Sequence, residues 1–298
     1  MRPLQKHLDP QTLTKLNRLQ LRVAKALDGY VAGRHRSPQK GFSVEFAEHR
    51  EYSPGDDLRH IDWRVFGRTE KYYVKRFEDE TNLVLHLLLD FSSSMQFRGA
   101  ESKQSKQQFA QRLAVVLAWL AIEQRDAVSL GVFTEELDAW SGIGNSWGHL
   151  DKAVQMMDQT QSQPKTSIGK SLHSFSNRIR KKGLVIVLSD FLVEIPDAMD
   201  GLNRLVHAGH DVVAMQVLDA SESTFPFRRT TLFRGVESKQ QVIAEPIALR
   251  KAYLNAFQEF QHQLQMQCRK SHIEFHQWDS SQAVDQAVAS FLLPRMFA

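Results

Sequence analysis

From residue 83 to its end, the chain alternates between short apolar runs and longer amphipathic stretches. The short runs carry few polar residues and predict strands buried on both faces, at 83–89, 127–133, 184–189, 212–218 and 272–278. The longer stretches repeat apolar residues every three or four positions and predict helices, at 104–124, 149–158, 168–180, 196–208, 246–268 and 281–293. This alternation predicts an α/β fold with a doubly wound, mostly parallel sheet flanked by helices.

Two parts of the chain depart from this alternation. Residues 1–80 combine a helix with short strands and precede the first expected strand of the sheet, so they predict an N-terminal subdomain. An α/β domain over residues 81–298 then follows. Within it, residues 137–140 are expected to pair back onto an edge of the sheet. Residues 221–245 interrupt the rhythm with turn residues, and we expect an excursion or a hairpin there.

The composition of the chain bears on its cellular compartment. The 298 residues include one cysteine, Cys268, so no internal disulfide can form, which fits a reducing compartment. The longest apolar stretches are too short to cross a bilayer, and the first residues lack the apolar core of a signal peptide. A cytoplasmic location without a membrane span is the resulting expectation.

The excess positive charge is confined to the N-terminal part. Residues 1–80 hold 16 Lys and Arg against 12 Asp and Glu, whereas residues 81–298 hold 22 of each. Acidic residues are interleaved throughout, which favours a solvated surface. Nucleic-acid binding through the basic N-terminal segment stays open as an alternative function.

Two predicted strands end in an aspartate. Asp90 closes the first strand and is followed by Ser92 and Ser94, and Asp190 follows a later strand. Neighbouring strands lie about 4.8 Å apart, and two carboxylates at ~5 Å repel by roughly 3 kcal/mol at an effective dielectric of ~20. A divalent cation would cancel this repulsion, with the hydroxyls as further oxygen ligands. The simpler alternative is that Ser92 and Ser94 cap a helix, that Thr166 does likewise, and that Asp190 bonds backbone amides.

The order and context of five residues resemble the metal-ion-dependent adhesion site of von Willebrand factor A domains. They are Asp90, Ser92, Ser94, Thr166 and Asp190. The resemblance implies that they surround Mg²⁺, or Mn²⁺, and leave one position open for an acidic side chain of a partner protein. It also implies binding rather than bond breaking, so the chain is not expected to be an enzyme.

A second string lies near the N-terminus, Pro54-Gly55-Asp56-Asp57-Leu58-Arg59-His60-Ile61-Asp62-Trp63. It resembles the signature of a bacterial family, domain of unknown function 58, in which the string precedes an adhesion-type domain. Asp219 and Glu222 fit the same family. The resemblance implies that the chain acts with a MoxR-type AAA+ ATPase in the assembly or maturation of other proteins.

The role of this string is open between two hypotheses. In the first it is a structural clasp, in which Asp57 caps a short helix, Arg59 pairs with Asp62, and Trp63 packs beneath the sheet. In the second, Asp56, Asp57 and Arg59 face a partner protein.

A metal-dependent hydrolase or phosphatase is the remaining alternative. Phosphatases that begin with an aspartate after the first strand need a second aspartate two residues later as the general acid. Ser92 occupies that position in place of an aspartate, and this favours protein binding over phosphatase activity.

Overall fold

The computed structural model of the chain describes residues 3–8, 44–51, 62–69, 71–79, 83–163, 167–236 and 240–296. The chain divides into two compact units. The smaller unit comprises residues 31–82, and the larger comprises residues 1–30 and 83–298. The division after residue 82 lies close to the predicted boundary, whereas the first residues of the chain group with the larger unit.

The smaller unit contains an antiparallel pair of strands and a short helix, β1 (Val44–Glu51), β2 (Tyr73–Asp79) and α3 (Trp63–Thr69). The side chain of Asp62 accepts a hydrogen bond from the amide of Val65 at 3.3 Å, which fixes the start of α3. Within this unit the side chain of Trp63 is 63% exposed and meets the edge of the Phe66 ring. Its expected packing beneath the sheet of the larger unit stays a prediction.

Asp56, Asp57 and Arg59 lie in the segment 52–61, outside the described residues. Neither hypothesis for the string is therefore tested, and both stay predictions.

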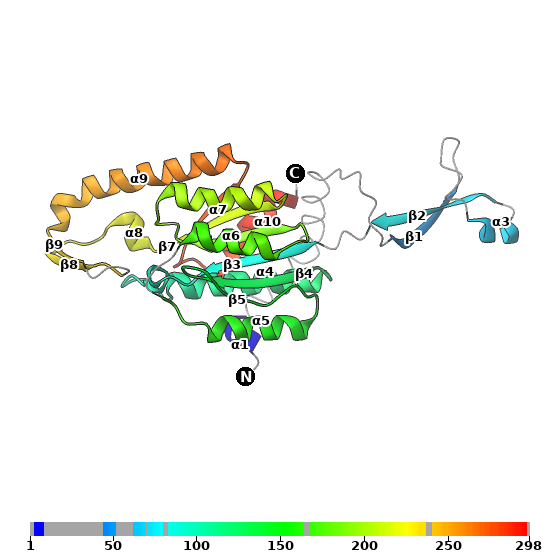
Figure 1. Cartoon of the computed structure of the whole chain (residues 1–298), viewed down its shortest axis with the longest axis horizontal. Helices are drawn as coiled ribbons and strands as arrows, with labels where there is room; N and C mark the ends of the chain where they lie inside the picture. The colour runs from blue at the N-terminus through cyan, green and yellow to red at the C-terminus, as the bar shows by residue number, and fades with distance from the viewer. Residues whose placement is uncertain are drawn as a thin grey trace. The chain divides into compact units, whose positions relative to one another are not determined.

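The larger unit is built on a six-stranded sheet (Figure 1). In spatial order its strands are β10 (Glu274–Asp279), β7 (Asp211–Leu218), β6 (Leu184–Ser189), β3 (Val84–Asp90), β4 (Ala127–Phe133) and β5 (Leu137–Trp140). Every neighbouring pair is parallel except β4 and β5. The predicted α/β class with a doubly wound, mostly parallel sheet flanked by helices is confirmed, and so is the edge strand that pairs back.

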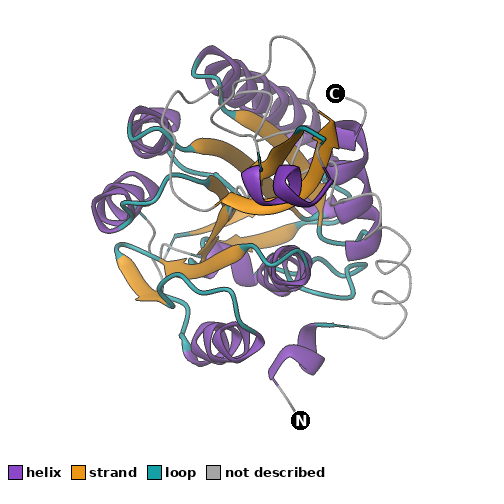
Figure 2. Ribbon diagram, turned by 90° about the vertical axis from the view of Figure 1, so that its right-hand side faces the viewer, coloured by secondary structure: helices purple, strands orange, loops and turns teal. Residues whose placement is uncertain are grey.

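Helices cover both faces of this sheet (Figure 2). They are α4 (Lys106–Glu123), α5 (Trp147–Gln159), α6 (Ile168–Arg178), α7 (Ile195–His207), α9 (Pro246–Lys270) and α10 (Val284–Leu292). Helices α4, α5 and α10 form one layer, and α6, α7 and α9 form the other. The short helix α1 (Pro3–His7) joins the first layer, where Lys6 and His7 contact Asp158 on α5 at 3.0 and 2.8 Å.

The segment that interrupts the alternation is a short helix followed by a hairpin. It consists of α8 (Ala220–Thr224), β8 (Thr231–Arg234) and β9 (Gln241–Ala244). The expected excursion is thus present, and it starts directly after β7.

The sheet has one topological switch point, between β3 and β6. The chain leaves β3 for β4 on one side and later returns to place β6 on the other side. In open α/β sheets the crevice outside the carboxyl ends of such strands is where ligands bind. Separately, no helix among the described residues is long and apolar enough to span a membrane.

Candidate functional site

Asp90 closes β3 at the switch point and is buried. One carboxylate oxygen accepts the amide of Ser92 at 2.8 Å, and the other accepts the hydroxyl of Ser189, at the end of β6, at 2.6 Å. Burial raises the pKa of Asp90 to about 7, and the negative charge of Asp190 adds to the rise. The two acids predicted to be neighbours are therefore close enough to influence each other.

The serine loop after β3 folds into a short 3-10 turn, η2 (Ser93–Gln96). The hydroxyl oxygens of Ser92 and Ser94 lie 3.0 Å apart, and the amide of Ser93 bonds the carbonyl of Gln163 at 2.9 Å. These two hydroxyls thus face the same edge of the sheet as the acids. Thr166 lies in the segment 164–166, outside the described residues.

Asp190 follows β6 directly and is buried. Its Oδ1 accepts the amide of Leu192 at 3.1 Å, and its Oδ2 accepts the ammonium of Lys106 at 2.8 Å. The structure therefore brings Asp90, Ser92, Ser94 and Asp190 together at one edge. It also adds a lysine that the sequence reasoning did not include.

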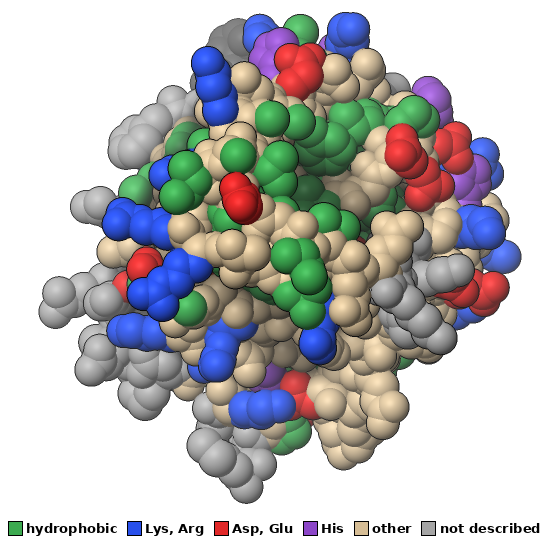
Figure 3. Space-filling model, turned by 90° about the vertical axis from the view of Figure 1, so that its left-hand side faces the viewer, with side chains coloured by type: hydrophobic (Ala, Val, Ile, Leu, Met, Phe, Trp, Pro, Cys, Tyr) green, Lys and Arg blue, Asp and Glu red, His purple; other side chains and the backbone are tan. Residues whose placement is uncertain are grey.

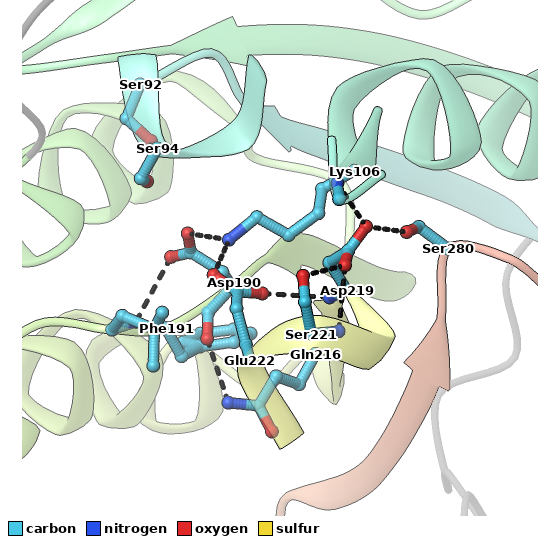
Figure 4. A network of polar contacts seen from close by, with 12 residues as sticks. Ser92, Ser94, Lys106, Asp190, Phe191, Gln216, Asp219, Ser221, Glu222 and Ser280 are labelled. Carbon is cyan, nitrogen blue, oxygen red and sulfur yellow. Dashed lines mark hydrogen bonds and ion pairs between the residues drawn. The ribbon is translucent and has the colours of Figure 1, made fainter. Parts of the chain in front are cut away.

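Lys106 lies in the first turn of α4 with no exposed surface, and its ammonium also bonds Glu222 at 2.7 Å (Figure 4). Burial alone would lower its pKa, but the carboxylates of Asp190 and Glu222 outweigh burial and raise it. The lysine is therefore charged at neutral pH. One signal could have revealed it, because residue 106 shares the helical face of the buried Phe109 and Leu113.

The partner acid Glu222 is held by a capping box on α8. Asp219 is the N-cap, its side chain bonds the amide of Ser221, and the Glu222 carboxylate accepts the amide of Asp219 at 2.8 Å. Asp219 also accepts the amide of Gly99 at 2.9 Å and the hydroxyl of Ser102 at 2.6 Å. Although burial opposes it, these hydrogen bonds lower the pKa of Asp219 to about 2. Asp219 thus ties the end of β7 to the loop after β3.

The predicted metal ligands can be tested against these contacts. Ser92 and Ser94 carry hydroxyl oxygens, which are suitable ligands for Mg²⁺. A nearby cation would also stabilise the negative charge of the buried Asp90 carboxylate. Asp190 does not fit, because its two oxygens already hold an ammonium and a backbone amide. At ~4 Å and an effective dielectric of ~20, a divalent ion and the ammonium would repel by roughly 8 kcal/mol. The described residues thus do not form the predicted two-acid metal site, and Mg²⁺ binding stays a prediction.

A groove of about 560 Å³ lies beside this cluster at the same edge of the sheet. Loop 97–102, α8 and β8 form its walls. Its lining includes the aromatic rings of Phe97, Phe227 and Phe233 and the side chains of Arg98 and Arg234. Figure 3 views this end of the molecule, where hydrophobic side chains gather around a hollow with Lys and Arg side chains beside it.

Three comparisons place the chain among known proteins. The family model of DUF58, described as a protein of unknown function, matches residues 48–263. The uncharacterized protein Rv1480 of Mycobacterium tuberculosis is 27% identical over 234 residues, which are 77% of this chain and 72% of that protein. The uncharacterized protein Mb1516 of Mycobacterium bovis gives the same values.

Two solved structures are similar at a lower level. The conserved hypothetical protein BatB from Bacteroides thetaiotaomicron has a TM-score of 0.48 and 17% identity, over 72% of this chain and 100% of that one. The VWA domain of SpRpn10 has a TM-score of 0.46 and 8% identity, over 70% of this chain and 95% of that one. With both scores below 0.5, no functional conclusion rests on them.

The family match confirms what the string from Pro54 to Trp63 predicted. It covers well over half of the chain, including both strand ends of the switch point and the Asp219–Glu222 capping box. The chain therefore belongs to the DUF58 family.

Proposed function

We propose that this chain is a protein-binding module that holds a segment of a partner protein at the carboxyl edge of its sheet. The resemblance of the predicted site residues to those of von Willebrand factor A domains suggests, at a coarse level, a protein-interaction module. The groove beside the Lys106 cluster is the observation that carries the finer proposal. It opens at the edge where this class of sheet binds its ligands.

The lining of the groove indicates the chemistry of the partner segment. Phe97, Phe227 and Phe233 offer apolar surface, and burying one large apolar side chain against them contributes roughly 1.5–3 kcal/mol. Arg98 and Arg234 are exposed at the same groove and favour a carboxylate. Such exposed pairs contribute only about 0.2–1 kcal/mol each, so they act mainly on orientation and association rate. The partner segment is therefore acidic and carries an apolar anchor.

The partner protein is proposed from the family resemblance. A MoxR-type AAA+ ATPase is the first candidate, and the process served would be assembly or maturation of another protein. The predicted absence of enzyme activity and the cytoplasmic location stay predictions. The basic segment of the nucleic-acid alternative lies mostly outside the described residues, so it too is left to experiment.

The test is equilibrium binding of a purified MoxR-type ATPase to the full chain by fluorescence anisotropy. The double variant Arg98→Glu/Arg234→Glu is expected to weaken binding by at least about tenfold, because it reverses the charge at the groove. Arg180→Glu is the matched control, since Arg180 is exposed at the opposite, amino edge of the sheet.

Two results would contradict the proposal. Failure of the wild-type chain to bind would remove the ATPase as the partner. Equal binding by the wild-type chain and the double variant would show that the partner uses another surface.

A further inference from the structure

We infer that the ammonium of Lys106 supplies the positive charge at this edge of the sheet, so that the described residues of the site need no divalent metal ion. The ammonium stands at Asp190, one of the two acids that the adhesion-site resemblance assigns to Mg²⁺. The inference goes beyond the proposed function and does not depend on it, because metal binding by the chain is measured without any partner.

The first support is the geometry around the ammonium. Its nitrogen lies 2.8 Å from Oδ2 of Asp190 and 2.7 Å from Oε1 of Glu222. The lysine side chain has no exposed surface, and Asp190 is 2% exposed. A lysine is almost never fully buried unless it is paired, and here it is paired twice. The positive charge of the lysine is thus compensated within the chain by two carboxylates.

The second support is that separate elements are built to hold this lysine. A capping box between Ser105 and Gln108 starts α4 one residue before it, and the amide of Lys106 bonds the carbonyl of Phe97 at 3.2 Å. The Phe97 ring centre lies 5.9 Å from the ammonium. On the other side, the capping box of α8 directs Glu222 to the same nitrogen (Figure 4). The lysine therefore joins loops from β3, β6 and β7, as a bound metal ion would.

The third support is competition for Asp190. A metal ion on Oδ2 would have to displace the ammonium, and Oδ1 already accepts the amide of Leu192. Displacing the ammonium would leave Glu222 without its cation in a partly buried position. The metal ion would compensate the charge of Asp190 but leave the charge of Glu222 uncompensated. The contacts at this edge therefore disfavour metal binding.

The experiment compares the wild-type chain with Lys106→Met, which removes the charge and keeps most of the side-chain volume. Melting temperatures are measured in MgCl₂ and in EDTA at equal ionic strength, and Mn²⁺ binding is measured by isothermal titration calorimetry. The wild-type chain is expected to show no saturable shift and no binding heat. Lys106→Met is expected to gain a rise of roughly 3 °C at ten times the dissociation constant of the ion.

A matched control is Lys103→Met, because Lys103 is exposed and lies three residues away. It is expected to behave like the wild-type chain. Saturable Mn²⁺ binding by the wild-type chain that is lost in Asp90→Asn would overturn the inference. A folded Lys106→Met variant whose melting temperature does not rise with Mg²⁺ would also overturn it. If Lys106→Met does not fold, the wild-type titration alone decides.

Discussion

At the scale of single residues, the edge of the sheet is governed by how buried charges are compensated. Lys106 is shared by Asp190 and Glu222, and Asp219 is satisfied by hydrogen bonds from the loop after β3. Removing one member of a buried ion pair usually costs about 3–5 kcal/mol, because the other charge is left uncompensated. The stability of the chain should therefore depend on these residues in a coupled way.

The coupling can be measured with a double-mutant cycle. Lys106→Met is expected to lower the free energy of unfolding by about 3–5 kcal/mol, because it leaves the carboxylates of Asp190 and Glu222 without their cation. Adding Glu222→Gln should recover part of that loss, since it removes one stranded charge. Urea unfolding of the two single variants and the double variant gives the interaction energy. An additive double variant would mean that Lys106 and Glu222 do not interact as the structure shows.

A second prediction at this scale concerns pH. His86 is buried in β3, where its ring contacts the Ser129 hydroxyl at 2.7 Å and the ring of His210. Burial lowers its pKa to about 4, and His210 adds to the effect. Between about pH 6.5 and pH 4, His86 is therefore protonated in the unfolded chain but neutral in the folded chain. The free energy of unfolding falls as the pH falls through this range.

The size of this loss follows from the two pKa values. Between pH 7.5 and pH 5 the wild-type chain should lose about 2 kcal/mol more than His86→Gln, which cannot titrate at this position. Urea unfolding of both proteins at the two pH values measures the difference. Equal losses in the two proteins would show that His86 is not the group responsible.

At the scale of elements, the site depends on close contact between the loop after β3 and the start of α8. Gly99 makes this contact, because a Cβ atom there would collide with the Asp219 carboxylate. The hydrogen bond from its amide to that carboxylate needs the same close approach. With any larger residue at this position, either the loop or the Asp219 side chain would have to shift.

Gly99→Ala is expected to lower the free energy of unfolding by about 1–3 kcal/mol, because the loop must move away from Asp219. Gly148→Ala in α5 is the matched control, since a Cβ atom there meets nothing within 4 Å. Alanine within a helix should leave stability unchanged or raise it by up to about 1 kcal/mol. Chemical denaturation of both variants checks the pair, and a neutral Gly99→Ala would contradict the described contact.

At the scale of the whole molecule, the sequence predicts the sheet of the larger unit well. The continuous apolar runs that end in Asp90 and Asp190 predict buried strands, and both strands are buried along their whole length. Between them, apolar residues recur every three or four positions, as expected of helices. The proximity of the two acids followed from their places at strand ends. Such predictions succeed because a continuous apolar run is typical of a strand that is buried on both faces.

The parts that were missed depend on contacts that a pattern cannot show. Lysine is normally a surface residue. The helical face that Lys106 shares with buried apolar residues hints at its burial, but the acids that compensate its charge, Asp190 and Glu222, are distant in the sequence. Helix α8 is five residues long, too short to show a helical period in the sequence. The hairpin after it was expected, but the groove that β8 lines together with α8 and loop 97–102 was not.

A crystal structure of the wild-type chain grown in Mn²⁺, with anomalous diffraction data, would decide whether Lys106 or a metal ion occupies this edge of the sheet. We expect no manganese peak at the carboxyl edge and a Lys106 ammonium between Asp190 and Glu222. An anomalous peak between Asp90 and Asp190, with the Lys106 side chain displaced, would contradict it.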